Sequence, residues 1–260
     1  MNTFDNIVSR PLGGRTIKPR VNGLTMIMDN GIGIAQLKDF LQISSEWIDI
    51  AKLGYGTSRL CPEEVVRAKI EAYRAHNIYV MPGGTFTEIV LAQGKLNEFL
   101  AEAKELGFNA LEVSDGTIRM NDDTRGDVIR QVAGEGFMVL SEVGSKFPDS
   151  AVSLKELIQE IHRDIELGVF QVIIEARESG VGIGIFNFSG NIVDEILNSI
   201  AEESDLTKVM FEAPQKNQQV ALIQQFGVNV NMGNIQPGQV LSLETLRAGL
   251  RADTLRGIYD

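Results

Sequence analysis

The chain has 260 residues, enough for one large α/β domain or two small ones. Its 35 acidic residues outnumber 24 lysines and arginines, and the formal net charge of -11 disfavours nucleic acid or an anionic membrane as a partner. The lone Cys61 excludes an intrachain disulfide and fits a reducing compartment. No signal peptide is recognisable, and no run approaches the roughly 20 apolar residues of a membrane span. We therefore expect a cytoplasmic protein.

Short apolar segments alternate with amphipathic stretches from Gly23 onward. The apolar segments predict strands over residues 24–28, 47–51, 78–81, 110–113, 138–140, 170–174, 209–211 and 228–232. The amphipathic stretches predict helices over residues 34–43, 62–75, 88–106, 123–134, 154–167, 192–202, 218–226 and 243–250. The fifth helix has the clearest start, because Ser153 and Glu156 have the spacing of a capping box.

Strands that alternate with helices indicate a parallel sheet, and about eight such units at this length favour a closed (β/α)8 TIM barrel over an open sheet. The predicted barrel is a single domain over residues 23–260. Residues 1–22 form an arm rich in Arg, Pro and Gly, which is either partly ordered or folded over the functional site.

Charged residues follow the predicted strands and gather, in a barrel, around one mouth. The carboxylates are Asp29, Asp115, Glu142, Glu175, Glu178 and Glu212. Two of them about 4 Å apart would repel by roughly 4 kcal/mol at an effective dielectric of 20, so cations are needed. Part of the balance comes from Lys52, Lys146, Arg177 and Lys216, and the all-oxygen ligand set suits Mg²⁺. The alternative is a set of structural salt bridges. Zinc is not expected, because His76 and His162 lie in predicted helices.

Glycines after two of the strands suit the binding of an anion. Gly83 and Gly84 follow the third strand, and residues 233–234 follow the eighth, where this architecture often binds phosphate. Arg247 and Arg251 on the last helix could reach that position, or could form a solvated helix face. The glycine-rich residues 180–184 lack the spacing of a dinucleotide loop and are better explained as a flexible loop over the mouth.

Several motifs in a fixed order resemble the phosphosulfolactate synthase family. They are residues 50–58 (IAKLGYGTS), 82–85 (PGGT), 112–116 (EVSDG), 139–144 (VLSEVG), 172–180 (VIIEARESG) and 211–216 (FEAPQK). Residues 242–251 resemble the C-terminal helix of the family, and the resemblance covers residues 20–257.

The resemblance implies a Mg²⁺-dependent enzyme on a (β/α)8 barrel that adds sulfite to phosphoenolpyruvate and forms (R)-2-phospho-3-sulfolactate. In methanogenic archaea this reaction opens coenzyme M biosynthesis, and in some bacteria it leads to sulfolactate. Members of the family tend to associate, so we expect a homo-oligomer. Heat-stress-associated relatives also belong to the family, and their role is unclear.

The implied chemistry suggests a role for each candidate residue. Attack of sulfite on the methylene carbon leaves negative charge on the substrate carboxylate, as an enediolate that a Lewis acid stabilises. We expect the metal ligands to come from Asp115, Glu142, Glu175 and Glu212. The cations for phosphate and sulfite are expected to be Lys52, Arg177, Lys216 and Arg247. Gly83 and Gly84 are expected to bind substrate, and Lys146 to donate the proton to the second carbon.

Two other functions remain open from the sequence. Lys52 or Lys146 could form a Schiff base with a carbonyl substrate, as in aldolases, and such an enzyme would not need a metal. A non-catalytic stress or interaction module could also keep the ancestral pocket.

Overall fold

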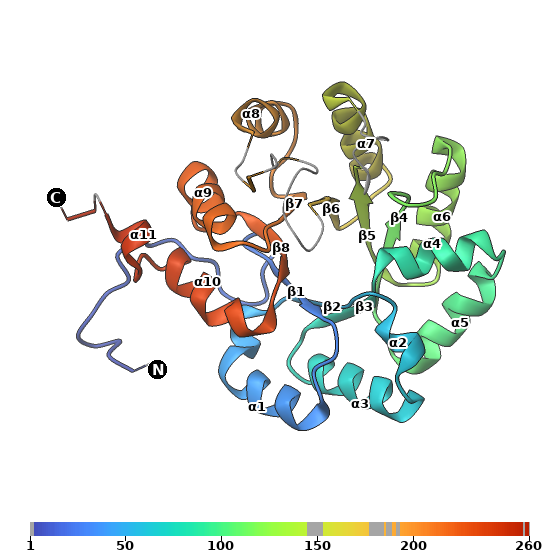
Figure 1. The fold of residues 1–260 in the computed structure, drawn as a ribbon, viewed down its shortest axis with the longest axis horizontal. Coiled ribbons are helices and arrows are strands. Elements are labelled where there is room, and N and C mark those ends of the chain that lie inside the picture. The colour runs from blue at the N-terminus through green and yellow to red at the C-terminus, as the bar shows by residue number, and fades with distance from the viewer. Residues whose placement is uncertain are drawn as a thin grey trace.

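The computed structural model describes residues 3–144, 153–176, 185, 189–190, 193–256 and 258–259. Within these residues, eight parallel strands form one sheet in the order β3-β2-β1-β8-β7-β6-β5-β4 (Figure 1). The strands are β1 (Thr25–Asp29), β2 (Ile50–Leu53), β3 (Tyr79–Pro82), β4 (Ala110–Ser114), β5 (Met138–Val143), β6 (Gln171–Ile174), β7 (Val209–Glu212) and β8 (Asn231–Ile235). The edge strands β3 and β4 meet, because the Asn109 N–H donates to the Val80 carbonyl (3.3 Å) and the Asn109 side chain accepts from the Val80 N–H (2.8 Å). The predicted barrel is confirmed.

Helices surround the strands, as Figure 1 shows. They are α1 (Ile34–Ser44), α2 (Thr57–Leu60), α3 (Glu63–Arg74), α4 (Gly84–Ala92), α5 (Leu96–Leu106), α6 (Asp122–Gly134), α7 (Leu154–Glu166), α8 (Asp194–Glu203), α9 (Lys216–Phe226), α10 (Val240–Arg247) and α11 (Ala252–Leu255). Two short 3-10 turns are also present: η1 (Ser45–Trp47) follows α1, and η3 (Pro237–Gln239) precedes α10. Among the described residues, no helix combines the length and the apolarity needed to cross a bilayer.

The structure corrects several of the predicted elements. β2 begins three residues later than expected, α10 begins three residues earlier, and the short helices α2 and α11 were not predicted. Two further differences have a clear physical cause. The single helix expected over residues 88–106 is two helices, because Gly94 takes a left-handed backbone conformation (φ +64°) after α4. The last strand lies three residues later than expected, at Asn231–Ile235. Its asparagines and glycine favour turns, but the buried Asn231 side chain donates hydrogen bonds to the Val209 carbonyl on the neighbouring β7 and to the Gln171 side chain on β6. The capping box of Ser153 and Glu156 is confirmed.

Two separate apolar clusters form the core. The larger one lies between the sheet and the helices, and a smaller one fills the barrel interior with Leu24, Met26, Ile50, Met81, Ala110, Leu140, Ile173 and Met210. Side chains alternate between these faces along each strand, so the inward positions that follow this inner cluster are Lys52, Glu112, Glu142 and Glu212. The interior of the barrel therefore changes from apolar to charged toward the carboxyl ends of the strands.

The N-terminal arm contacts the end of the barrel where the strands begin. Arg20 forms a buried ion pair with Asp49, just before β2 (3.2 Å), and Arg15 pairs with Glu244 of α10 (3.0 Å). The Lys18 ammonium donates to the carbonyls of Ser45 (3.1 Å) and His76 (3.0 Å). The described part of the arm thus lies opposite the mouth, and the alternative of an arm folded over the site is wrong.

We expect Arg20→Met to destabilise the fold without changing catalysis. Loss of the guanidinium leaves Asp49, which is 5% exposed, buried without its ion partner, and such a loss costs about 3–5 kcal/mol. Thermal unfolding and steady-state kinetics would show a lower Tm with an unchanged KM. Arg67→Met is the control, because the exposed pair of Arg67 with Glu63 is worth at most about 1 kcal/mol. An altered KM in Arg20→Met would contradict this placement of the arm.

Candidate active site

A layer of charged side chains lines a cavity at the carboxyl ends of the strands. Lys52 comes from β2, Glu112 from β4, Glu142 from β5 and Glu212 from β7, and Glu175 directly follows β6. The cavity has a volume of ≈ 380 Å³ and is also lined by the glycines and Tyr55 that follow β2 and β3. The strands of a parallel barrel all end at this mouth, so Lys52 and Glu212, which are 160 positions apart in the sequence, meet here.

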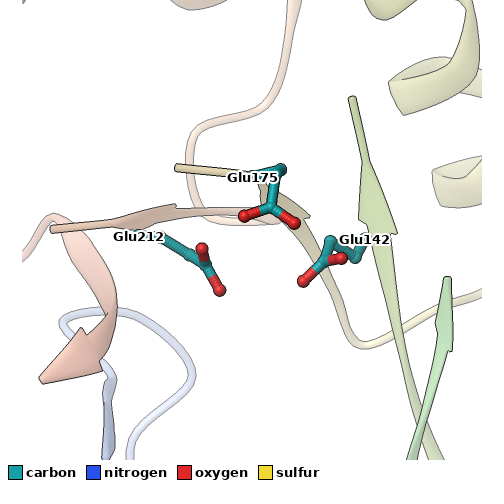
Figure 2. Close-up of side chains that lie close together, drawn as sticks. All are labelled: Glu142, Glu175 and Glu212. Carbon is teal, nitrogen blue, oxygen red and sulfur yellow. The ribbon is translucent and has the colours of Figure 1, made fainter. Parts of the chain in front are cut away.

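Glu142, Glu175 and Glu212 form the acidic part of the cavity. One oxygen from each carboxylate lies within 4.8 Å of the others, and each residue is at most 3% exposed. Figure 2 shows the three side chains reaching a common space from neighbouring strands. Ligands on opposite sides of Mg²⁺ lie about 4.2 Å apart, so a small contraction would bring these oxygens to one ion. This buried acidic group has the ligand chemistry of a divalent metal site.

Lys52 supplies positive charge next to the acidic group. Its ammonium lies 2.8 Å from Glu112, 3.4 Å from Glu212 and 3.6 Å from Glu142. Burial alone would lower the pKa of Lys52, but these three carboxylates outweigh that effect and hold the pKa well above its usual value. Lys52 is therefore a fixed cation at neutral pH.

The balance of charge is incomplete among the described residues. Burial raises the pKa of Glu212, repulsion from Glu142 raises it further, and Lys52 opposes both effects. One ammonium facing four carboxylates leaves an excess of negative charge in a site of low dielectric. The expected alternative of structural salt bridges accounts for the three contacts of Lys52.

Helix α4 begins at the cavity wall and requires glycine there. The Gly84 N–H donates to the Glu112 carboxylate (2.9 Å), so a residue of this chain already accepts from the helix N-terminus. A Cβ on Gly84 would lie 2.2 Å from the same carboxylate oxygen. Gly83 has no such conflict, because its nearest neighbours would lie 3.6 Å or more from a Cβ. Both glycines line the cavity, but close approach to Glu112 explains only Gly84.

We expect Gly84→Ala to lower activity and stability, and Gly83→Ala to have little effect on either. The added methyl group must displace Glu112, and overpacking of this kind costs about 1–3 kcal/mol. Displacement of Glu112 also releases Lys52 from its shortest contact. Parallel measurements of Tm and kcat/KM on the two variants test this expectation. Equal effects in both variants would show that Glu112 does not set the requirement for glycine.

Three of the residues expected at the site lie elsewhere. Asp115 pairs with Arg125 (3.0 Å) and is not part of the acidic group. Lys216 is half-exposed and pairs with Asp253 of α11 (2.9 Å). Arg247 is fully buried at the opposite end of the barrel, where it donates to the carbonyls of Leu24 and Val228. The structure therefore contradicts the expectation that Arg247 binds substrate, because its side chain cannot reach the mouth.

Other expected residues are structural or undescribed. Asp29 is buried and bonded to Lys69 (2.8 Å) and Tyr73 (2.8 Å), so it fixes α3 against β1. His76 and His162 are exposed, and neither lines the cavity. Lys146, Arg177, Glu178 and the glycine-rich residues 180–184 lie outside the described residues.

Sequence reasoning missed Glu112 of the cavity wall, whereas Asn234 was expected at the mouth as part of residues 233–234. Glu112 lies within an otherwise apolar strand. Glu112 and Ser114 are two residues apart, and this spacing indicates that both side chains point to the same face of the strand. Asn234 at the end of β8 also lines the cavity and has a positive φ of 55°. Its side chain offers an amide near the acidic group.

Comparison with known proteins decides the family. The sequence model of the family described as (2R)-phospho-3-sulfolactate synthase (ComA) matches residues 13–253. The chain belongs to this family. The chain is 44% identical to the phosphosulfolactate synthase of Methanocaldococcus jannaschii over 89% of the chain and 93% of that protein. The identity is 41% with the phosphosulfolactate synthase of Methanothermobacter thermautotrophicus, over 98% of both chains.

More distant likenesses agree with the fold. Protein HEAT-STRESS-ASSOCIATED 32 of Arabidopsis thaliana is 22% identical over 90% of the chain and 88% of its own length. The crystal structure of 3-hexulose-6-phosphate synthase from Salmonella typhimurium matches with a TM-score of 0.54 at 12% identity, over 91% of the chain and 95% of that protein. At this low identity the structural match supports the TIM-barrel architecture of the chain and says nothing about its substrate.

Proposed function

We propose that the chain catalyses the Mg²⁺-dependent addition of sulfite to phosphoenolpyruvate, giving (2R)-phospho-3-sulfolactate. The observation that carries the proposal is the buried group of Glu142, Glu175 and Glu212 beside Lys52, in a chain with phosphosulfolactate synthases as its relatives. A site that brings two anions together needs more cationic charge than the described residues supply, and a divalent ion supplies it.

The three glutamates are proposed to hold the ion, and when bound it would supply a Lewis acid for the substrate carboxylate. Asp115 is not included, because its carboxylate is engaged by Arg125. Sulfite forms the new carbon–sulfur bond with the methylene carbon, and the π electrons of the double bond move toward the carboxylate. Lys52, held as a cation at the floor of the cavity, stabilises that developing charge.

A proton must then reach the second carbon on one face. We retain Lys146 as the proposed acid, because it follows Glu142 closely in the sequence, and Arg177 as a proposed cation for one of the two anions. Gly83 also lines the cavity, but its N–H already donates to the Leu53 carbonyl (3.2 Å), so we propose that it shapes the cavity wall without a hydrogen bond to the substrate. Lys216 is proposed to bind a substrate anion only in a state in which its ion pair with Asp253 is broken.

A Schiff-base enzyme is less compatible with the geometry around Lys52. Formation of a Schiff base needs the neutral amine, and three carboxylates hold Lys52 in its protonated form. A non-catalytic module would not need a buried, mutually repelling group of carboxylates.

The direct test mixes the purified protein with phosphoenolpyruvate, sulfite and Mg²⁺ and follows the sulfonated product by mass spectrometry. The proposal expects product, and its loss on addition of EDTA. Turnover that survives EDTA, or a covalent adduct trapped by borohydride with a keto substrate, would support the Schiff-base alternative. Absence of both product and phosphoenolpyruvate binding would support the non-catalytic module.

A further inference from the structure

Ser114 lies between two buried carboxylates at the end of β4. Its hydroxyl is 2.9 Å from Glu142 Oε1 and 3.0 Å from Glu88 Oε1. All three residues are at most 3% exposed, so water does not replace these contacts. The hydroxyl has a single hydrogen, and an ionised carboxylate can only accept. Both contacts are hydrogen bonds when a proton lies between Glu88 and the Ser114 oxygen, so that Glu88 donates to Ser114 and the hydroxyl donates to Glu142.

Glu88 is fixed by contacts beyond Ser114. Its other oxygen accepts from the backbone N–H groups of Thr117 (2.8 Å) and Ile118, in the loop after β4. Glu88 lies one turn after Gly84 on α4. The Gly84 N–H donates to Glu112, which lies on β4 together with Ser114. One face of α4 thus contacts both inward-facing polar residues of β4, so the position of Glu88 is tied to the wall of the cavity.

The backbone of Glu142 has a separate anchor. Arg125 of α6 donates to the Glu142 carbonyl (3.1 Å) and to Asp164 of α7 (2.6 Å). Main chain and side chain of Glu142 are therefore held from two directions. Ser114 contacts Oε1 of the carboxylate, and Lys52 lies 3.6 Å from Oε2.

We propose that Glu88, acting through Ser114, is a positioning residue that orients the Glu142 carboxylate for the divalent ion. The inference rests on the proposed function, since it takes Glu142 as a metal ligand. A ligand held in its binding geometry before the ion arrives loses less conformational freedom on binding. Removal of such outer partners of a metal ligand typically costs about 10- to 100-fold in metal affinity or activity.

The first test compares Ser114→Ala with Ser141→Ala. Ser141 is also buried and precedes Glu142 directly, but no hydrogen-bond partner of its hydroxyl is found among the described residues. Mn²⁺ binding without substrates, followed by electron paramagnetic resonance, is expected to weaken roughly 10- to 100-fold in Ser114→Ala. Ser141→Ala is expected to bind Mn²⁺ as the wild type does. Equal affinity in the two variants would overturn the inference.

Kinetics separate positioning from a general structural defect. In Ser114→Ala we expect a higher Mg²⁺ activation constant, with kcat largely restored at saturating Mg²⁺. A variant that is merely unstable would show a lower Tm without a selective change in Mg²⁺ dependence. A kcat that stays low at saturating Mg²⁺, with normal Mn²⁺ affinity, would contradict the proposed role.

The second test asks whether Glu88 acts through Ser114. Glu88→Ala should weaken Mn²⁺ binding, and the double variant with Ser114→Ala should bind no more weakly than the Ser114→Ala variant alone. Glu88→Gln should preserve binding, because its amide can donate to the Ser114 oxygen and leave the hydroxyl hydrogen for Glu142. Two results would contradict the action of Glu88 through Ser114. One is a double variant in which the losses of Mn²⁺ affinity of the two single variants multiply. The other is a loss of Mn²⁺ affinity in Glu88→Gln as large as in Glu88→Ala.

The two proposals fail in different ways. If the wild type binds Mn²⁺ and forms product while Ser114→Ala behaves like Ser141→Ala, the positioning role is wrong and the proposed function stands. If the wild type forms no product from phosphoenolpyruvate and sulfite, the proposed function is wrong whatever the variants do.

Discussion

Replacement of Glu175 by Gln is expected to lower kcat/KM by roughly 10³-fold, because a Lewis acid contributes several kcal/mol to such a reaction. Glu175 is one of the three buried carboxylates proposed to hold the ion, and Gln keeps its size while removing the charge. Calorimetric titration with Mg²⁺ should show a matching loss of affinity.

Glu244→Gln is the matched control for Glu175→Gln. Glu244 is also buried, but it pairs with Arg15 at the opposite end of the barrel. We expect this variant to lose stability and to keep its affinity for Mg²⁺. The different Mg²⁺ affinities of the two variants distinguish a ligand of the ion from a member of an ordinary ion pair. Normal turnover by Glu175→Gln, or unchanged Mg²⁺ affinity, would contradict its role as a ligand.

Lys52→Met is expected to destabilise the metal-free protein by about 3–5 kcal/mol, because carboxylates are left buried without their cation. Mg²⁺ should recover part of this loss, since it would balance the same carboxylates. The Mg²⁺-dependent increase in Tm should therefore be larger in Lys52→Met than in the wild type. Turnover should fall even when Mg²⁺ restores the fold, because the fixed cation at the floor of the cavity is gone.

Lys69→Met is the control for Lys52→Met. Both lysines are 4% exposed and ion-paired, but Lys69 pairs with Asp29, outside the acidic group. Its removal should lower the Tm by an amount that Mg²⁺ does not selectively recover. Thermal unfolding of both variants with and without Mg²⁺ tests the comparison. An equal response to Mg²⁺ in the two variants would show that Lys52 and the ion do not share carboxylates.

Much of the acidic group could be predicted from the sequence, because strand direction alone brings the ends of parallel strands together. Glu142, Glu175 and Glu212 end or follow β5, β6 and β7, and the structure gathers them within 4.8 Å. Asp115 also follows a strand, but Arg125, ten residues later on α6, engages its carboxylate. Sequence position therefore predicted which end of the barrel each residue occupies, and tertiary contacts decided which side chains meet.

The error at Arg247 has a geometric cause. A helix that follows a barrel strand runs back toward the end where the strands begin, so its last residues lie far from the mouth. Arg247 ends α10 and contacts the residue before β1. Lys216 begins α9 and is near the carboxyl end of β7, but its side chain pairs outward with Asp253. The position of a residue along its helix would have separated these two cases.

Helix α4 shows what local sequence preferences could not reveal. Gly and Thr are weak helix formers, so a helix start at Glu88 was the natural prediction, and it hid the turn that begins at Gly84. Glu112 on β4 accepts the Gly84 N–H, and this contact exists only once the barrel has formed. The partnership of Glu88 with Ser114 depends on the same helix start.

The most direct measurement is a crystal structure of the protein with Mn²⁺ in place of Mg²⁺, using the anomalous signal to locate the ion. The account predicts one peak at the mouth of the barrel, bound by oxygens of Glu142, Glu175 and Glu212. A peak bound by other residues, or no peak at this position under conditions in which the crystalline enzyme turns over, would contradict it.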